Sequence, residues 1–120
     1  MADLQSLDIG VMPLRDDPWS WGKCGLKIIQ YQGVGVPVVC TPVGINRDLV
    51  EDGVNGYYAT TPSEWEQKLS LLIENPKLRE QMGREGRKRV LENYTYEVSA
   101  PRLLSILDRL VEKTLRGKEI

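Results

Sequence analysis

The segment best suited to bind an anion is residues 22–27, with the sequence GKCGLK. It opens a helical pattern, and the backbone N–H groups at a helix start attract negative charge together with the positive end of the helix dipole. Its glycines allow a ligand to approach the backbone, and Lys23 adds a positive charge. A diphosphate would fit this chemistry, although the local sequence equally allows Gly22 and Gly25 to serve only the turn.

The inventory of side chains excludes several kinds of catalysis. The sequence contains no histidine, so Ser-His-Asp and Cys-His mechanisms and histidine-ligated zinc are ruled out. The two cysteines, Cys24 and Cys40, are spaced for neither a CxxC redox pair nor a four-ligand metal site, and we expect reduced thiols. Any acid–base step would therefore fall to carboxylate, lysine, tyrosine or cysteine side chains. No metal site is evident in the sequence, and we predict no metal and no cofactor.

Two carboxylates and two indoles lie shortly before this segment. Asp16 and Asp17 could form a pair for metal binding or acid–base work, but a solvated loop before Pro18 explains them more simply. Trp19 and Trp21 could stack on a sugar or a base. They could equally cover the end of the sheet or face a neighbouring domain.

Three short apolar runs predict the strands that position these residues: 8–14, 37–41 and 56–60. The first two are nearly continuous rather than alternating, which is typical of parallel strands covered by helices on both faces. Residues 23–34 carry apolar side chains at helical spacing, so the order is strand, helix, strand. We predict an α/β fold: a Rossmann-like, three-layer arrangement with a short parallel sheet of about three strands flanked by helices.

The second half of the sequence predicts long C-terminal helices. Residues 61–64 (TPSE) form a helix start, with threonine at the N-cap, proline at the first helical position and glutamate closing a capping box. We expect residues 75–76 (NP) to begin the next helix in the same way, and the last helix to span about residues 96–115. Residues 46–51 predict a short helix.

Residues 33–35 (GVG) begin like a dinucleotide-binding fingerprint. However, they follow a helix and precede a strand, which is the reverse of the context in which glycines bind pyrophosphate. A helix C-cap followed by a turn explains them better.

The composition predicts a folded domain that does not bind nucleic acid. The 120 residues are 41% hydrophobic and 28% charged, which is ordinary for one globular domain. The 16 basic and 17 acidic residues leave a net charge of −1, whereas nucleic-acid binding needs a basic excess. The first residues do not resemble a signal peptide and no stretch reaches the roughly 18 apolar residues of a membrane span. We therefore predict a cytoplasmic protein.

One basic cluster stands out within the helical half: Arg84, Arg87, Lys88 and Arg89. Such a cluster could meet a phosphate or an acidic membrane surface, which leaves a peripheral membrane contact open. A solvated helix face is the simpler interpretation.

An ordered set of motifs extends over nearly the whole sequence. The segments that carry it are residues 8–14 (DIGVMPL), 22–27 (GKCGLK), 30–31 (QY), 35–39 (GVPVV), 41–44 (TPVG), 51–56 (EDGVNG), 64–65 (EW) and 82–87 (MGREGR). Together they resemble the C-terminal part of a family-4 retaining glycosyltransferase of group 1. The resemblance implies a GT-B enzyme, in which two Rossmann-like domains face each other and the C-terminal one binds a nucleotide-sugar donor without an essential divalent ion.

The resemblance also implies the donor-binding residues. By position they are Gly22, Lys23, Cys24, Gly25, Leu26 and Gln30. The first five would approach the diphosphate and the sugar of the donor, and Gln30 would hydrogen-bond its ribose. The family's usual pair of glutamates falls on Gly22 and Gln30, so no carboxylate is supplied to the donor sugar there, and we assign no catalytic residue.

The family's acceptor-binding N-terminal domain and the upstream strands of its donor domain have no counterpart in residues 1–120. We therefore expect a partial C-terminal nucleotide-sugar-binding domain, inactive alone, that uses a UDP- or GDP-sugar in polysaccharide or lipid-linked glycan assembly. Its partner would be the missing N-terminal domain or a second copy of the chain, because an exposed sheet edge favours self-association. The alternative is a non-catalytic nucleotide-binding or interaction module.

Overall fold

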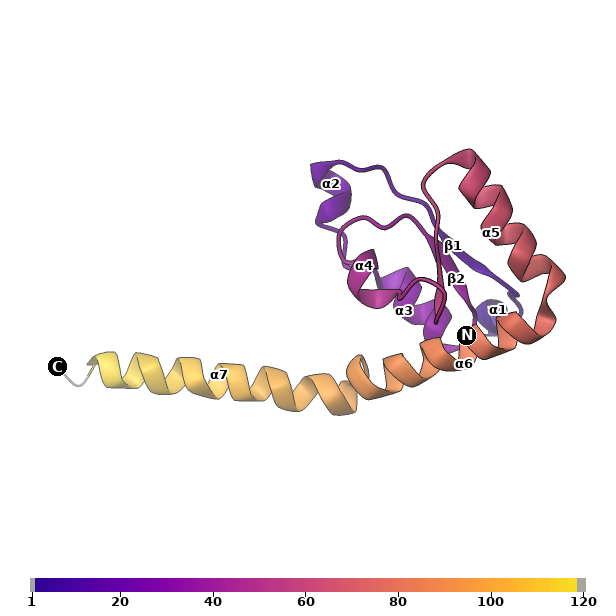
Figure 1. Cartoon of the computed structure of the whole chain (residues 1–120). Helices are drawn as coiled ribbons and strands as arrows, with labels where there is room; N and C mark the ends of the chain where they lie inside the picture. Colours follow the sequence, from indigo (N-terminus) through magenta and orange to yellow (C-terminus); the bar gives the residue numbers. More distant parts are fainter. Residues whose placement is uncertain (1, 119–120) are drawn as a thin grey trace.

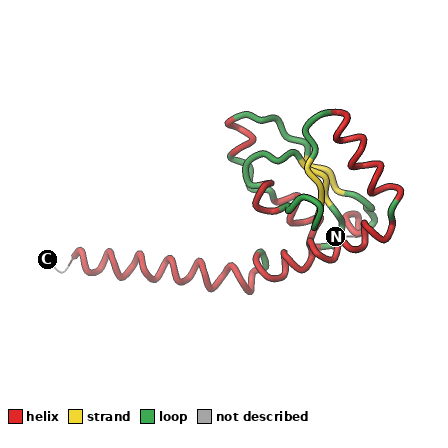
Figure 2. The backbone as a smooth tube through the Cα atoms, in the orientation of Figure 1, coloured by secondary structure: helices red, strands yellow, loops and turns green. Residues whose placement is uncertain are grey.

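A parallel sheet of three strands lies at the centre of the fold (Figures 1 and 2). The computed structural model describes residues 2–118. Strands β1 (Gly10–Met12), β2 (Val38–Cys40) and β3 (Gly56–Tyr58) pair in the order β1-β2-β3. In the register, Val39 lies opposite Val11 on one side and Tyr57 on the other. The predicted α/β fold with a short parallel sheet is confirmed, although each strand is shorter than the apolar run that predicted it.

Helices cover both faces of the sheet, which explains the continuous apolar sequence of β2. Its side chains alternate between the two faces, and all three residues are fully buried. On one face, helices α3 (Leu26–Gly33) and α4 (Asn46–Leu49) contribute to a core of Ile28, Val38, Cys40, Leu49 and Val50. On the other face, helices α5 (Pro62–Glu74) and α6 (Pro76–Asn93) contribute to a core of Val39, Ala59, Leu72 and Met82. The three-layer arrangement is thus confirmed.

Glycines allow α3 and α6 to pack closely against each other. A Cβ atom on Gly83 would overlap the carbonyl group of Gly35. Gly35 has φ +78°, and the N–H of Val36 donates to the carbonyl of Tyr31 at 2.9 Å. Gly35 therefore ends α3 in the left-handed conformation that is typical of helix C-termini, as the context of residues 33–35 predicts. Residues 33–35 do not form a phosphate-binding loop.

The helix starts follow the sequence in one case and depart from it in another. At α5, the hydroxyl of Thr61 accepts a hydrogen bond from the N–H of Glu64 at 3.2 Å, as predicted. At α6, Pro76 occupies the first position, but the Asn75 side chain makes no cap and donates to the carbonyl of Leu71 at 3.0 Å. The predicted start of α6 at residues 75–76 is therefore confirmed, but the side-chain cap seen at α5 is absent, because the Asn75 side chain is directed to the end of α5.

Two short helices were not predicted, and α4 is shorter than expected. Helix α1 (Ala2–Gln5) precedes β1, and helix α2 (Pro18–Trp21) lies within the segment interpreted as a loop. Helix α4 ends at Leu49 rather than at residue 51, because Val50 is extended and the side-chain oxygen of Asn55 accepts a hydrogen bond from the N–H of Glu51. The Asn55 side chain therefore organises the turn that leads into β3.

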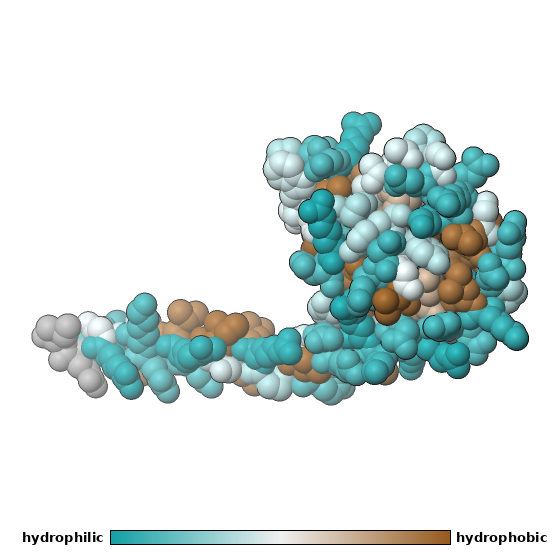
Figure 3. Space-filling view, in the orientation of Figure 1, coloured by the Kyte–Doolittle hydropathy of each residue, from teal (hydrophilic) through white to brown (hydrophobic). Residues whose placement is uncertain are grey.

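Helix α7 (Tyr96–Lys118) extends away from the rest of the chain (Figure 1). It runs slightly beyond the predicted residues 96–115, and none of its residues is buried. Hydrophobic side chains gather along it in Figure 3. The large ones exposed are Leu103, Leu104, Ile106, Leu107, Leu110, Val111 and Leu115. Within residues 2–118, no helix is long and apolar enough to cross a membrane.

Candidate functional site

A hollow of about 630 Å³ has two walls. One is the end of β1 with the residues that follow it, and the other is the start of α3. It is lined by Val11, Met12, Pro13, Leu14, Gly22, Lys23, Cys24, Gly25, Leu26 and Lys27. Ligands of open parallel sheets bind at the carboxyl ends of the strands, and this hollow occupies that position. The structure therefore brings together Gly22, Lys23, Cys24, Gly25 and Leu26 around one cavity.

Gln30 does not line the hollow. It lies four residues after Leu26, which places it one helical turn further along the same side of α3. Its side chain is exposed. Of the six residues for which a binding role is predicted, Gln30 is the only one outside the cavity wall.

The conformation of Gly25 sets the direction in which α3 begins. Gly25 is the N-cap residue with φ +68°, and a Cβ atom there would overlap the side chain of Leu49. The first helical hydrogen bond runs from the N–H of Ile29 to the carbonyl of Gly25 at 3.2 Å. The N–H groups of residues 26–28 precede this bond, so they are available to an anion at the helix start.

The side chain of Thr41 holds the loop after β1 against the end of β2. Its hydroxyl accepts a hydrogen bond from the N–H of Leu14 at 2.9 Å. The carbonyl of Thr41 accepts another from the buried amide of Asn46, also at 2.9 Å. Neither Thr41 nor the part of residues 8–14 that lines the hollow was among the predicted site residues. The position of this segment at a strand end was the signal that could have found it.

The acidic pair before α2 has a structural role. Asp17 caps α2 by accepting a hydrogen bond from the N–H of Ser20 at 2.8 Å. That backbone hydrogen bond, followed by one from the Ser20 side chain, lowers the pKa of Asp17. Asp16 accepts a hydrogen bond from the indole N–H of Trp21 at 2.6 Å. The solvated-loop interpretation was incomplete, since the Asp-Pro start that predicts an N-cap was present in the sequence.

The two cysteines have different environments. Cys24 is exposed at the hollow, whereas Cys40 is buried in the core, and both are unpaired thiols. Burial, together with the nearby negative charge of Asp52, raises the pKa of Cys40 to about 12. Cys40 therefore remains a neutral core side chain at physiological pH.

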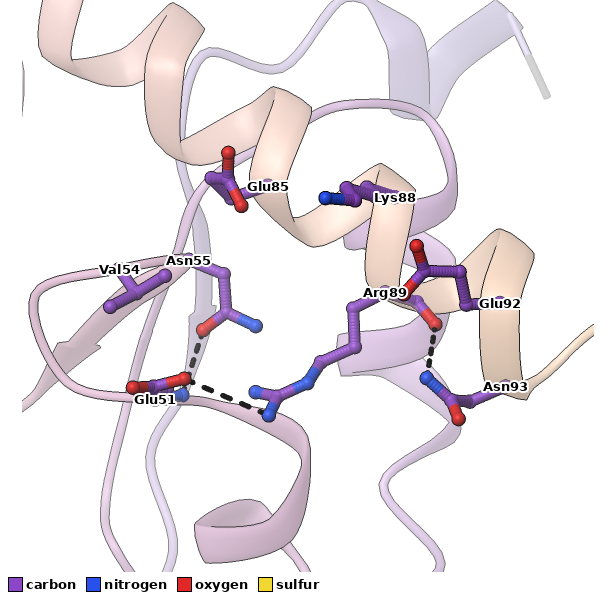
Figure 4. A pocket seen from close by; sticks show the side chains of 8 residues that line it. All are labelled: Glu51, Val54, Asn55, Glu85, Lys88, Arg89, Glu92 and Asn93. Atoms are coloured by element: carbon purple, nitrogen blue, oxygen red, sulfur yellow. Dashed lines mark hydrogen bonds and ion pairs between the residues drawn. The ribbon is translucent and has the colours of Figure 1, made fainter.

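A second cavity, of about 270 Å³, lies between α6 and the turn before β3 (Figure 4). It is lined by Glu51, Val54, Asn55, Glu85, Lys88, Arg89, Glu92 and Asn93. Arg89 and Glu51 form an ion pair across it, with 3.8 Å between the side-chain nitrogen and oxygen. The lining side chains carry both signs of charge, with three glutamates against Lys88 and Arg89, so the cavity has no basic excess that would attract a phosphate.

Contacts within the chain engage most of the predicted basic cluster. Arg84 forms an ion pair with Glu80 at 3.7 Å, and Arg87 donates to the carbonyl of Gly33 at 2.8 Å. With Arg89 paired to Glu51, Lys88 is the only member whose side chain forms no ion pair or hydrogen bond among residues 2–118. These contacts favour the interpretation of the cluster as part of the folded surface.

The fold and the hollow define an α/β domain with a cavity, lined in part by Lys23 and Lys27, at the carboxyl end of a parallel sheet. Residues 3–89 match the sequence profile of the family "Glycosyl transferases group 1". The chain belongs to this family, as the motifs of the sequence implied, and its domain fold matches those of GT-B glycosyltransferases.

Individual relatives agree with this assignment. Spore coat protein SA of Bacillus subtilis is 26% identical over 89 residues, which are 70% of this chain and 24% of that protein. The structure is similar to sucrose-phosphate synthase from Thermosynechococcus elongatus, with a TM-score of 0.83 and 19% identity over 92% of this chain and 27% of that one. It is also similar to the protein HepE from Anabaena in complex with UDP, with a TM-score of 0.71 and 18% identity over 88% and 29%. The chain thus spans only about a quarter of the length of these relatives.

Proposed function

We propose that this chain is the donor-binding part of a retaining glycosyltransferase that moves a sugar from a nucleotide-diphospho-sugar to an acceptor hydroxyl in glycan assembly. The observation that carries the proposal is the hollow at the start of α3, where exposed Lys23 lies beside the first N–H groups of the helix. Family membership supports sugar transfer as the chemistry. The UDP bound to the Anabaena protein supports a nucleoside diphosphate as the ligand class.

In this proposal the donor diphosphate lies against the N–H groups of residues 26–28. The positive end of the α3 dipole and the ammonium group of Lys23 would stabilise the negative charge that develops on the diphosphate as the bond to the sugar breaks. Lys27, which also lines the hollow, adds a second positive charge. Gln30, one turn further along α3, would hydrogen-bond the ribose through its exposed amide.

The carboxylates near the hollow are engaged elsewhere. Asp17 caps α2 and Asp16 binds the Trp21 indole, while Gly22 has no side chain. We therefore assign donor binding and charge stabilisation to this chain. The groups that bind and activate the acceptor would belong to another part of the enzyme, and residues 1–120 alone would be inactive.

We further propose that the apolar face of α7 and the open edge of β1 are contact surfaces, and that the enzyme works in the cytoplasm, where nucleotide-sugars are made. The edge of β1 carries backbone groups that a further strand could pair with. The N-terminal half of a complete glycosyltransferase, or a second copy of the chain, would cover these surfaces.

A nucleotide titration tests the donor site. We expect UDP or GDP to shift the amide NMR signals of residues 22–27 in the labelled chain. Lys23→Ala should weaken the binding about fivefold, the upper range for one exposed charge of about 1 kcal/mol. Lys88→Ala is the matched control, because this lysine lines the other cavity. Absence of any shift at residues 22–27 with millimolar nucleotide would contradict the proposal.

A further inference from the structure

Helix α2 presents two large aromatic side chains to solvent at the border of the hollow. Trp19 is 81% exposed and Trp21 is 56% exposed, whereas the third tryptophan, Trp65, packs against the core. A recess of about 380 Å³ is lined by Pro18, Trp19, Gly22 and Lys23. Gly22 and Lys23 also line the hollow, so the recess adjoins the hollow. An exposed indole does not contribute the stabilisation that its burial would give. Trp19 and Trp21 are therefore not part of the hydrophobic core.

The backbone that carries these indoles is held in place. Asp17 caps α2, and the hydrogen bond from Trp21 to Asp16 restrains the Trp21 ring. Gly44, with φ +57°, lies directly against α2: a Cβ atom there would stand 3.1 Å from the Trp21 carbonyl oxygen. The aromatic groups therefore project from a capped helix that packs against Gly44.

We propose that Trp19, together with Pro18 at the recess beside the hollow, binds a sugar ring by stacking. The ligand class rests on the proposed function, because the recess adjoins the place given there to the donor diphosphate. A pyranose has an apolar face of C–H groups and a rim of hydroxyls. The C–H face packs on the electron-rich face of an indole. The hydroxyls can accept hydrogen bonds from the ammonium group of Lys23, which lines the recess.

Charge and size favour a sugar over a membrane or a protein partner. Residues 15–23 hold two basic and two acidic side chains, Arg15 and Lys23 against Asp16 and Asp17. This segment lacks the basic excess that binds acidic lipids. Two indoles offer about 400 Å², roughly half of what one partner contributes to a standard protein interface. One sugar ring needs only a single indole face.

The sugar could belong to the donor or to an acceptor glycan, and the indole N–H signals of the three tryptophans in the labelled chain separate these sources. The probes are UDP, UDP-glucose, GDP-mannose, free hexose and N-acetylhexosamine oligosaccharides, and vesicles of acidic lipid. If the donor sugar binds, a nucleotide-sugar shifts the Trp19 signal and UDP alone does not. If an acceptor glycan binds, a free oligosaccharide shifts it without nucleotide. In both cases the signal of Trp65 should remain unchanged.

Variants measure the stacking. Trp19→Ala should weaken the sugar response about three- to tenfold, as expected for one aromatic contact, and Trp19→Phe should retain most of it. Tyr96→Ala is the control, because Tyr96 is an exposed aromatic residue on α7. The inference is overturned if no sugar-bearing probe moves the Trp19 or Trp21 signals, or if only vesicles of acidic lipid move them.

The two proposals fail separately in this experiment. If UDP shifts the signals of residues 22–27 and no sugar shifts the indole signals, sugar stacking is overturned and the proposed donor site is supported. An indole response to free oligosaccharide without any response to UDP supports sugar stacking and contradicts the donor site.

Discussion

Helices α5 and α7 are both amphipathic, yet their apolar faces have different environments. Leu72 on α5 is fully buried against the sheet, whereas Leu104 on α7 is 60% exposed. The sheet supplies α5 with a surface to pack on, and no element among residues 2–118 does so for the exposed stretch of α7. The comparison shows that apolar periodicity specifies a helix and its face, while burial depends on a partner surface.

The largest expected difference between the two regions comes from truncating one leucine in each. Leu72→Ala should lower the free energy of unfolding by about 2–5 kcal/mol, because it leaves a cavity in a close-packed core. Leu104→Ala, the matched control on α7, should change it by no more than about 0.5 kcal/mol. Urea denaturation measures both values. Equal losses would mean that α7 packs against the domain in solution.

A glycine-to-alanine pair should give effects of opposite sign. Gly83→Ala places a methyl group against the carbonyl of Gly35, so we expect a loss of about 1–3 kcal/mol from overpacking between α3 and α6. Gly117→Ala has no atom within 4 Å of the added Cβ, and should raise the helicity of α7 without reducing stability. Thermal unfolding followed by circular dichroism measures both. A neutral Gly83→Ala would show that the two helices can separate.

The smallest effect on stability is expected when charged residues are introduced on the apolar face of α7. The same change tests most directly whether this face is a contact surface. The double variant Leu104→Glu with Val111→Glu should leave the free energy of unfolding within about 0.5 kcal/mol, because both side chains are exposed. It should abolish any self-association of the chain, which sedimentation analysis measures as a fall in mass. The variant Glu112→Gln controls for a change of charge on the same helix. Unchanged association would locate the contact at the β1 edge instead.

The candidate site could be predicted in part. The residue types of 22–27 indicated a helix start able to attract an anion, and the structure places them around one hollow. Helix α2 was missed because the Asp17-Pro18 start precedes only four helical residues, too few for apolar periodicity to develop. The role of Thr41 could not be predicted, since the hydroxyl binds the N–H of Leu14, far away in the sequence.

The sequence alone determined the features that depend on neighbours along the chain. These include the cap of Thr61 on α5, the turn at Gly35 and the apolar runs of the strands. The tertiary structure alone decided which apolar faces are buried, that Gly25 accommodates Leu49, and that α2 rests on Gly44 beside the hollow. The physical reason is range: capping and turn formation act over a few residues, whereas close packing joins residues that only the completed fold brings together.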